Sequence, residues 1–550
     1  MAAPPVSLQE ALAEALPDKT DTHPAFECKV HYIHTPPKPC EPLFSPPPGQ
    51  PAERTRLARH FLAVSIEKEP AEAGRSSTPD HRHQDFVLGI GIEVLIYTTA
   101  RLTTLFVSKA DTTGYIPAHA PSKTKPLCRA FLTWLATEHR TRHPRRQLVV
   151  SLFARAQDQY LFPGSIENPA KHVLDDRRLI RWWAQVLDPL LDLPQSDATT
   201  SNPAPTADIS AHLVIPGHEP NELRSYFPKT SHALNRSWTP AHPLHELAAT
   251  RIGFDPITAA TLPPRCLLPR FPDDPKARFI QDLDDEVGLT SHSVSSSSSA
   301  NSSSPSKRKT GAEGRSAWNS IHDLARFWEA MEFRQECASG RVVGFLWLLI
   351  AGAPSPPQDL DLNNTNDDEE LTGESQDSMT SLASSSAAAA SQPPPTSSPT
   401  LPSPRTITRK TLAGPIHARK PRLKGSSSSA KTSHPSSSSA VLATATNDNN
   451  QETSSTLSLP PKIYDAALHT LLHLDFASRA IAVISTSKWV KAVADSCGVR
   501  EWGFVVKGRR KVVGLGSAVP GDGAGAGNAE RKVNDLGSMV RRKKRKVEEG

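Results

Sequence analysis

The segment DFVLGIGIEVLIYTT, residues 85–99, decides the fold class of this chain of 550 residues. Its apolar side chains recur at every second position, a period that predicts a β-strand. They are Phe86, Leu88, Ile90, Ile92, Val94 and Ile96. The following ARLTT predicts a turn, and LFVS at 105–108 is expected to return beside the first strand as a hairpin partner.

Further strands and helices are predicted on both sides of this hairpin. RHFLAVSI at 59–66 and QLVVSLFA at 147–154 are predicted strands, the second fully buried. A helix is predicted around residues 127–135, and a second helix over 175–191, capped near Asp175 and broken by Pro189. We therefore expect an α/β fold: a single mixed domain with a central β-sheet flanked by helices and interrupted by disordered insertions.

The composition limits how much of the chain can fold. It holds 51 Pro, only 6% aromatic residues and long serine runs, so part of it cannot bury enough apolar surface. We expect one domain over 1–352. It begins with a short helix, predicted by the capping box of Ser7 and Glu10, and continues as proline-rich coil to about residue 53. Disordered loops are expected at 67–84 and 287–315. A low-complexity insertion at 353–458 follows. A C-terminal helical segment at 459–506 is expected to pack on the domain, ahead of a disordered basic tail at 507–550.

Charge and cysteine usage point to the nucleus. The net charge is +6, and six consecutive cations close the tail: Arg541, Arg542, Lys543, Lys544, Arg545 and Lys546. Such a run is typical of a nuclear localisation signal or a polyanion-binding tail, the alternative being a solvated tail without a role. The six cysteines show no CxxC spacing, so we expect neither a zinc site nor disulfides, and no metal.

No secretory or membrane-spanning segment is expected. The N-terminus lacks the basic start and apolar run of a signal peptide. The longest apolar stretch, VVGFLWLLIAGA from Val342, is shorter than the roughly 18 residues that a spanning helix needs. We interpret it as a buried element.

Two loops and one tryptophan suggest a ligand pocket. KADTTGY at 109–115 is explained by turn chemistry alone, but its amides and hydroxyls could also hold a phosphate-bearing ligand. ARAQDQYLFPGSIENPAKH at 154–172 carries aromatic and cationic residues between a strand and a helix. In that helix Trp183 lies in the apolar stripe, whereas Trp182 points about 100° away, which makes it a candidate pocket wall.

The segment FPDDPKARF, residues 271–279, predicts the start of a helix. Asp274 is a good N-cap and Pro275 suits the first helical position, so local structure alone explains these residues. The pattern does not reveal whether this helix start is also a functional site.

Four motifs in this order resemble one family: VSKADTTGY, QYLFPGSIENPAKH, RWW and FPDDPKARF. The chain resembles the fungal histone acetyltransferases that modify lysine 56 of histone H3, which are related in fold to CBP-type acetyltransferases. The resemblance covers roughly residues 7–352, with a looser match after 458. It implies transfer of acetyl from acetyl-CoA to histone H3, in support of nucleosome assembly and genome stability. Because no cysteine lies inside the four motifs, we expect direct attack on acetyl-CoA without a covalent enzyme intermediate.

The resemblance also implies roles for individual residues. Cofactor contacts are expected from Ala110, Asp111, Thr112, Phe153, Gln157, His172, Val173, Leu174 and Trp182. Tyr160 and Trp183 are expected near the transfer centre, Asp274 as proton acceptor or donor, and Lys276 as a site of autoacetylation. The segment IPAHAPSKTKP after Gly114 departs from the family pattern, so which of its cations meet the CoA phosphates is left open.

Partners and alternatives follow from the same resemblance. It implies histones H3–H4 presented by chaperones of the anti-silencing-function and nucleosome-assembly-protein types, in the nucleus, with no membrane and no sequence-specific DNA binding. Because a lysine ammonium has a pKa of about 10.4, something must take its proton before attack. Asp274 is either that base or a positioning group. The alternatives are a non-catalytic histone- or DNA-binding scaffold and an acetyltransferase for non-histone lysines.

Overall fold

The computed structural model describes residues 6–19, 25–67, 86–116, 123–193, 209–230, 236–287, 317–334, 337, 341–353 and 453–511. All of them belong to one compact unit, residues 1–353 together with 441–550. Nearly all residues of the predicted loops at 67–84 and 287–315 and of the insertion at 353–458 lie outside the described residues, as does the cationic run at 541–546.

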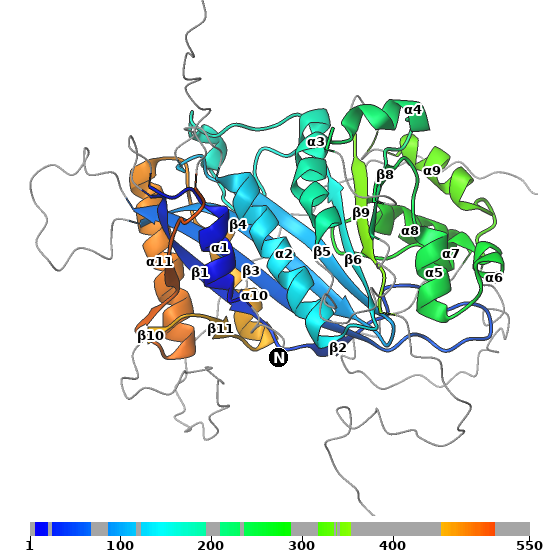
Figure 1. Ribbon diagram of the computed structural model, residues 1–550, viewed down its shortest axis with the longest axis horizontal. Coiled ribbons are helices and arrows are strands. Elements are labelled where there is room, and N and C mark those ends of the chain that lie inside the picture. Colours follow the sequence, from blue (N-terminus) through cyan, green and yellow to red (C-terminus); the bar gives the residue numbers. More distant parts are fainter. Residues whose placement is uncertain are drawn as a thin grey trace, which may run out of the picture. The chain divides into compact units, whose positions relative to one another are not determined.

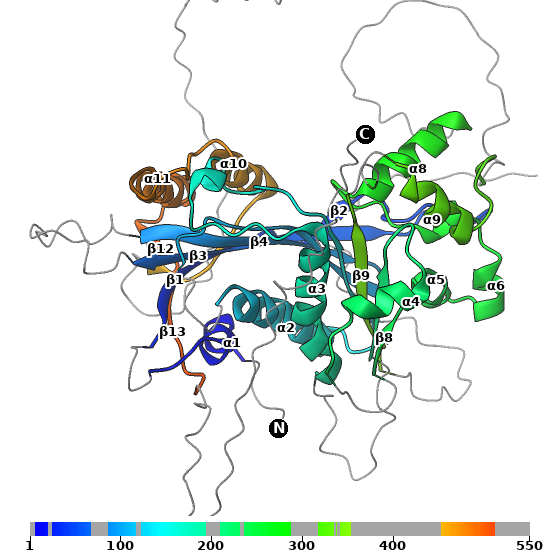
Figure 2. The same ribbon diagram turned by 90° about the horizontal axis from the view of Figure 1, so that it is seen from above.

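A large mixed β-sheet forms the centre of this unit (Figures 1 and 2). Its main path runs β11-β1-β3-β4-β5-β6-β9-β7-β8; β13 also pairs with β1, and β2 with β3. The strands are β1 Glu27–His34, β2 Lys38–Cys40, β3 Thr55–Glu67, β4 Phe86–Thr98, β5 Leu102–Thr112, β6 Gln147–Ala154, β7 Ile209–Val214, β8 Trp238–Thr239, β9 Gly344–Ile350, β11 Leu457–Ser458 and β13 Phe504–Lys507. β10 (Thr453–Ser454) and β12 (Glu501–Trp502) pair separately. The predicted mixed α/β class is confirmed.

The predicted hairpin is present, but its second strand is longer than expected. β4 and β5 pair antiparallel, and nearly all of β4 is buried. We predicted a turn at 109–115, whereas residues 109–112 continue β5, because residues 90–93 of β4 supply their pairing partners across a bulge at Glu93/Val94. The chain turns at Gly114, whose φ of 84° is unfavourable for other residues.

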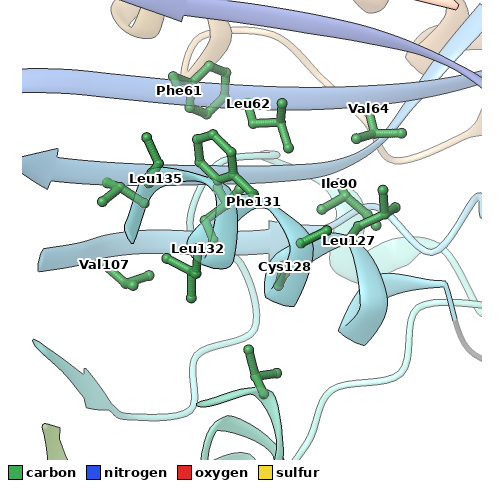
Figure 3. Close-up of a cluster of buried hydrophobic side chains, with 14 of the residues drawn as sticks. Phe61, Leu62, Val64, Ile90, Val107, Leu127, Cys128, Phe131, Leu132 and Leu135 are labelled. Carbon is green, nitrogen blue, oxygen red and sulfur yellow. The ribbon is translucent and has the colours of Figure 1, made fainter. Parts of the chain in front are cut away.

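Helices cover both faces of the sheet. α1 (Leu8–Ala15), α2 (Thr124–Arg142) and α3 (Asp176–Leu187) lie on one face, and α10 (Pro461–Leu471) and α11 (Arg479–Cys497) on the other (Figure 2). α2 is held by an apolar stripe that packs toward the strands: Leu127, Cys128, Phe131, Leu132 and Leu135 (Figure 3). The predicted cap of α3 is confirmed, since Asp175 accepts a hydrogen bond from the amide of Arg178 at 2.8 Å. So is its end before Pro189, which lies in the 3₁₀ turn η4 (Asp188–Asp192).

A second group of helices lies at the β9–β7–β8 end of the sheet (Figure 1). It comprises α4 (Pro220–Leu223), α5 (Leu244–Ile252), α6 (Pro256–Ala260), α7 (Pro264–Leu267), α8 (Pro275–Glu286) and α9 (Leu324–Glu332), with the 3₁₀ turn η5 (Arg224–Tyr226). The apolar faces of α5 to α9 pack with Phe106, Phe345 and Trp347 into a second core. This core holds the start of α8, where FPDDPKARF lies.

Two expectations about the chain ends need correction. The short helix predicted at the start is confirmed as α1, with a capping box between Ser7 and Glu10. The residues from there to 53 are not all coil, because the proline-free run ECKVHYIH forms β1 inside the sheet. The C-terminal segment predicted as helical is broken between α10 and α11, where Ser478 caps α11. It also supplies strands, because β13 pairs with β1 and so joins the two ends of the chain in one sheet. Among the described residues, no helix is long and apolar enough to cross a membrane.

Candidate active site

A cleft of about 340 Å³ opens beside the end of the β4–β5 hairpin. Four parts of the chain line it: the hairpin, the start of α2, the loop at 156–174 and α3. Its volume is at the lower end of the range, about 300–1,000 Å³, typical of small-molecule sites. The hairpin contributes Gly89, Ile90, Gly91, Ala110, Asp111 and Thr112.

Most residues that the family resemblance singled out come together here. Ten of them line the cleft: Ala110, Asp111, Thr112, Gln157, Tyr160, His172, Val173, Leu174, Trp182 and Trp183. They come from β5, from the loop after β6 and from α3. Phe153, Asp274 and Lys276 are not among the lining residues.

Two adjacent tryptophans form one wall of the cleft. Their rings are perpendicular, with centroids 4.9 Å apart. Trp183 is buried in the core, whereas Trp182 is partly exposed, as its position off the apolar stripe predicted. An indole that is not needed to fill the core and faces a cleft offers a flat apolar surface to a ligand.

Asp111 fixes the loop that carries Tyr160. One carboxylate oxygen accepts hydrogen bonds from the amides of residues 160–162, at 2.8, 2.9 and 3.3 Å. The other accepts from the ammonium of Lys171 at 3.0 Å, and both side chains of this ion pair are buried. Lys171 also donates to the hydroxyl of Ser165 at 2.7 Å. Asp111 therefore shapes the cleft wall through the backbone.

Tyr160 lies where this loop meets the cleft. Its hydroxyl donates to the carbonyl oxygen of Arg155 at 3.1 Å. Burial raises the pKa of Tyr160, so the phenol stays protonated at neutral pH and acts as a hydrogen-bond donor.

Among the lining residues that the predicted site did not include, three have ionisable side chains: Lys123, Cys128 and Lys171. Lys123, at the start of α2, is the cation of the divergent segment that reaches the cleft; Lys171 was noticed only as a loop cation. Cys128 of α2 also lines the cleft, and burial raises the pKa of its thiol to about 12. A thiol protonated to this extent is a poor nucleophile. The helical pattern predicted that α2 is buried but not that its first turns face a cleft.

Phe153 belongs to the second core instead of the cleft. In β6 it pairs with Phe345 of β9, and its ring lies 6.2 Å from that of Phe106. Since side chains alternate along a strand, the face that Phe153 occupies is set by the register of β6. Phe153 does not line the cleft, and its expected cofactor contact stays a prediction.

Asp274 and Lys276 form a buried ion pair at the start of α8. Asp274 caps the helix, as predicted, by accepting the Lys276 amide at 2.9 Å, and its second oxygen binds the Lys276 ammonium. The ammonium also lies 4.1 Å from the centroid of the Phe345 ring. Burial lowers the pKa of Lys276, and the charge of Asp274 opposes this effect. Both carboxylate oxygens of Asp274 are engaged within α8.

Beside this pair, the hairpin and α8 are joined by Lys109. Its ammonium lies 3.0 Å from a carboxylate oxygen of Asp273 and 3.5 Å from one of Glu93. Glu93 is buried and accepts a hydrogen bond from the hydroxyl of Tyr464 in α10 at 3.2 Å. The signal for Glu93 was present in the sequence, as a charged residue inside an apolar strand, but the pattern names no partner.

Within the described ranges, no group of three or more histidine, cysteine or acidic residues is placed to bind a metal ion. None of the six cysteines, all of which are described, forms a disulfide.

Comparison with known proteins identifies the family. The model of the histone acetyltransferase KAT11-type domain matches residues 8–141 and 122–492. The histone acetyltransferase rtt109 of Aspergillus flavus is 40% identical over 360 residues, which cover 63% of this chain and 56% of that protein. The rtt109 of Schizosaccharomyces pombe is 28% identical over 315 residues, 54% of this chain and 69% of that protein. The match thus spans little more than half the length of the first relative.

A solved structure has the same fold. The crystal structure of Rtt109 from Aspergillus fumigatus aligns with a TM-score of 0.60 and 33% identity, covering 92% of this chain and 100% of that one. The chain belongs to the histone acetyltransferase KAT11-type family.

Proposed function

We propose that the protein is a histone lysine acetyltransferase that uses acetyl-CoA. The observation that carries this proposal is the cleft, in which residues of three separate family motifs line one space beside the hairpin end. The cleft suits such a donor, because apolar Ile90, Leu174 and Trp182 lie near the cations Lys123 and Lys171. Acetyl-CoA supplies an activated acetyl thioester.

The expected reaction is direct transfer. The neutral amine of the acceptor lysine attacks the thioester carbonyl, a C–N bond forms, the C–S bond breaks, and the coenzyme leaves as a thiol after taking up a proton. The protonated thiol of Cys128 favours this route over an acetyl-cysteine intermediate. Tyr160 and the tryptophan pair are proposed to position the reacting groups.

We further propose histone H3 as substrate, with lysine 56 as acceptor, in H3–H4 presented by a histone chaperone in the nucleus. This finer specificity rests on the family resemblance. Lys276 is the proposed site of autoacetylation. Its buried amine has a lowered pKa, which increases the fraction that is neutral and nucleophilic.

The test is transfer of labelled acetyl from acetyl-CoA to H3–H4, with and without an anti-silencing-function-type chaperone, followed by mass spectrometry of the histones. We expect transfer to H3 lysine 56 that requires the chaperone. The variant Trp182→Ala should weaken acetyl-CoA binding and slow transfer. An exposed change outside the cleft lining, Lys491→Ala, should leave transfer at the wild-type level.

The rival function is a non-catalytic histone- or DNA-binding scaffold, which the basic segments favour. Histone or DNA binding by the wild-type chain without any acetyl transfer would support this scaffold and overturn the proposed activity. Label on other proteins in preference to H3 would instead favour an acetyltransferase for non-histone lysines.

The role of Asp274 is tested by the pH dependence of kcat/KM. If Asp274 is the base, Asp274→Asn should remove the acidic limb of the wild-type profile. An unaltered profile with a lower kcat would assign Asp274 a positioning role.

A further inference from the structure

Lys109 lies at the junction of three parts of the molecule. It belongs to β5, its ammonium pairs with Asp273 just before α8, and it pairs across the hairpin with Glu93, which Tyr464 of α10 contacts. The four side chains form a continuous row from α8 over the hairpin to the C-terminal segment. None of the four residues takes part in the proposed acetyl transfer as described above.

The row adjoins the cleft. Glu93 and Lys109 are partners across the antiparallel hairpin, and two residues away along each strand Gly91 pairs with Asp111. Both Gly91 and Asp111 line the cleft. Two residues along a strand correspond to about 7 Å and return to the same face of the sheet. The ammonium of Lys109 is therefore on the sheet face from which Asp111 holds the Tyr160 loop.

The local backbone is specialised on both sides of Lys109. β4 carries a bulge at Glu93/Val94, and bulges are a common means of redirecting side chains beside functional sites. Asp273 has φ of 59°, in the left-handed region that few residues other than glycine adopt. The carboxylate of Asp273 is 67% exposed, so burial does not hold this conformation, whereas its ion pair with Lys109 links it to β5.

Asp274 follows this link directly in the chain. Its side chain is tied to Lys276 within the first turn of α8, so the carboxylate moves with that turn as a unit. The residue immediately before it is the one that Lys109 anchors to the cleft-forming strand. A displacement of about 1 Å at a reacting centre can cost roughly 100-fold in rate.

We propose that Lys109 is a positioning residue for acetyl transfer. It holds the start of α8 against the β4–β5 hairpin. Through Glu93 and Tyr464 it also links the start of α8 to helix α10 in the C-terminal segment. This inference rests on the proposed function. Lys109 is expected to affect the rate of transfer and the position of the acceptor lysine, without contacting the acetyl donor.

The experiment compares Lys109→Met, Lys109→Arg and Asp273→Asn in the full chain with H3–H4, chaperone and acetyl-CoA. We expect Lys109→Met and Asp273→Asn to lower kcat about 10-fold or more, with the Kd for acetyl-CoA within about twofold of wild type. Lys109→Arg can still bridge two carboxylates and should regain most of the rate. Asp273 is exposed, so Asp273→Asn tests the link even where Lys109→Met fails to fold.

The matched control is Arg334→Met, which removes another ion pair of α8, with Asp282, away from the helix start. It should leave kcat unchanged. Coupling to α10 is tested by Tyr464→Phe, whose effect on kcat should be much smaller in a Lys109→Met background than in wild type.

Three outcomes would overturn the inference while leaving the proposed function intact: wild-type kcat in both Lys109→Met and Asp273→Asn, an equal loss in Arg334→Met, or a loss explained wholly by weaker acetyl-CoA binding. Absence of transfer by the wild-type protein would instead overturn the proposed function itself.

Discussion

Replacing Asp111 with asparagine should destabilise the fold and weaken donor binding together. The carboxylate accepts three amides of residues 160–162 and the ammonium of Lys171. Both side chains of the ion pair are almost fully buried, at 7% and 4% exposed. Asparagine keeps one acceptor oxygen but loses the charge, which leaves the Lys171 ammonium with the hydroxyl of Ser165.

The expected cost is set by the orphaned ammonium. Removing one partner from a buried ion pair typically costs about 3–5 kcal/mol, against a total stability of about 5–15 kcal/mol for a native protein. We therefore expect Asp111→Asn to lower the free energy of unfolding by about 3–5 kcal/mol. Because the amides of 160–162 lose their charged acceptor, the Tyr160 loop should shift and the Kd for acetyl-CoA should rise about 10-fold or more.

Urea denaturation and calorimetric titration with acetyl-CoA measure the two effects. The double variant Asp111→Asn/Lys171→Met removes the orphaned cation and should regain about 1–3 kcal/mol relative to the sum of the single effects. As a control, Asp282→Asn breaks the more exposed ion pair with Arg334 and should cost at most about 1 kcal/mol. A cost of Asp111→Asn as small as that of the control, with unchanged donor binding, would refute this account of the cleft.

Three further predictions concern self-modification, pH and the cleft thiol. Lys276→Arg should abolish the acetylated peptide at that position and slow turnover, as mass spectrometry and steady-state kinetics would measure; unchanged kinetics would contradict a role for this modification. Burial lowers the pKa of His31 to about 3 and that of His212 to about 4. Both histidines are neutral in the folded protein, so below about pH 6.5 the unfolded chain takes up protons before the folded one does. The free energy of unfolding should therefore fall by up to about 1.4 kcal/mol per histidine and pH unit between pH 6.5 and 4. Denaturation midpoints that do not change over this window would contradict the prediction. Cys128→Ala should retain at least about a third of wild-type kcat because the thiol is protonated, whereas complete loss of activity in a folded variant would reopen the question of an acetyl-cysteine intermediate.

The periodicity of apolar residues predicted the central strands and helices, because these elements are long and are buried either on one face or on both. β4 and the buried face of α2 illustrate this. The cap at Asp175 and the break before Pro189 were also predictable, since both act through nearby backbone groups. β1 was missed because flanking prolines dominate the composition of its neighbourhood, and its pairing with β13 joins residues more than 470 apart, which no local pattern encodes.

The extension of β5 at the candidate site is a second case in which tertiary pairing, which local sequence patterns do not encode, determines the structure. The residues KADT have turn propensity, but the free edge of β4 offers ladder partners for them, and pairing across the bulge outweighs propensity. This tertiary effect places Asp111 on a rigid strand under the Tyr160 loop. The sequence pattern described Asp111 as a turn residue and suggested a pocket from its loop, the loop at 154–172 and Trp182, whereas the individual cofactor contacts came only from the family resemblance.

In FPDDPKARF, the two carboxylate oxygens of Asp274 have a structural role and are also the atoms that a catalytic base would use. One oxygen of Asp274 caps α8 and the other binds the Lys276 ammonium, so neither is available to an acceptor amine in this arrangement. A base role would require the Lys276 ammonium to be neutralised or moved. Acetylation of Lys276 does the former, because an amide carries no charge, and would leave the carboxylate buried beside one backbone amide. A carboxylate in that state has a raised pKa and is a stronger base. This geometry predicts that the proposed autoacetylation promotes proton transfer: if Asp274 is the base, the unmodified enzyme should be the slower form.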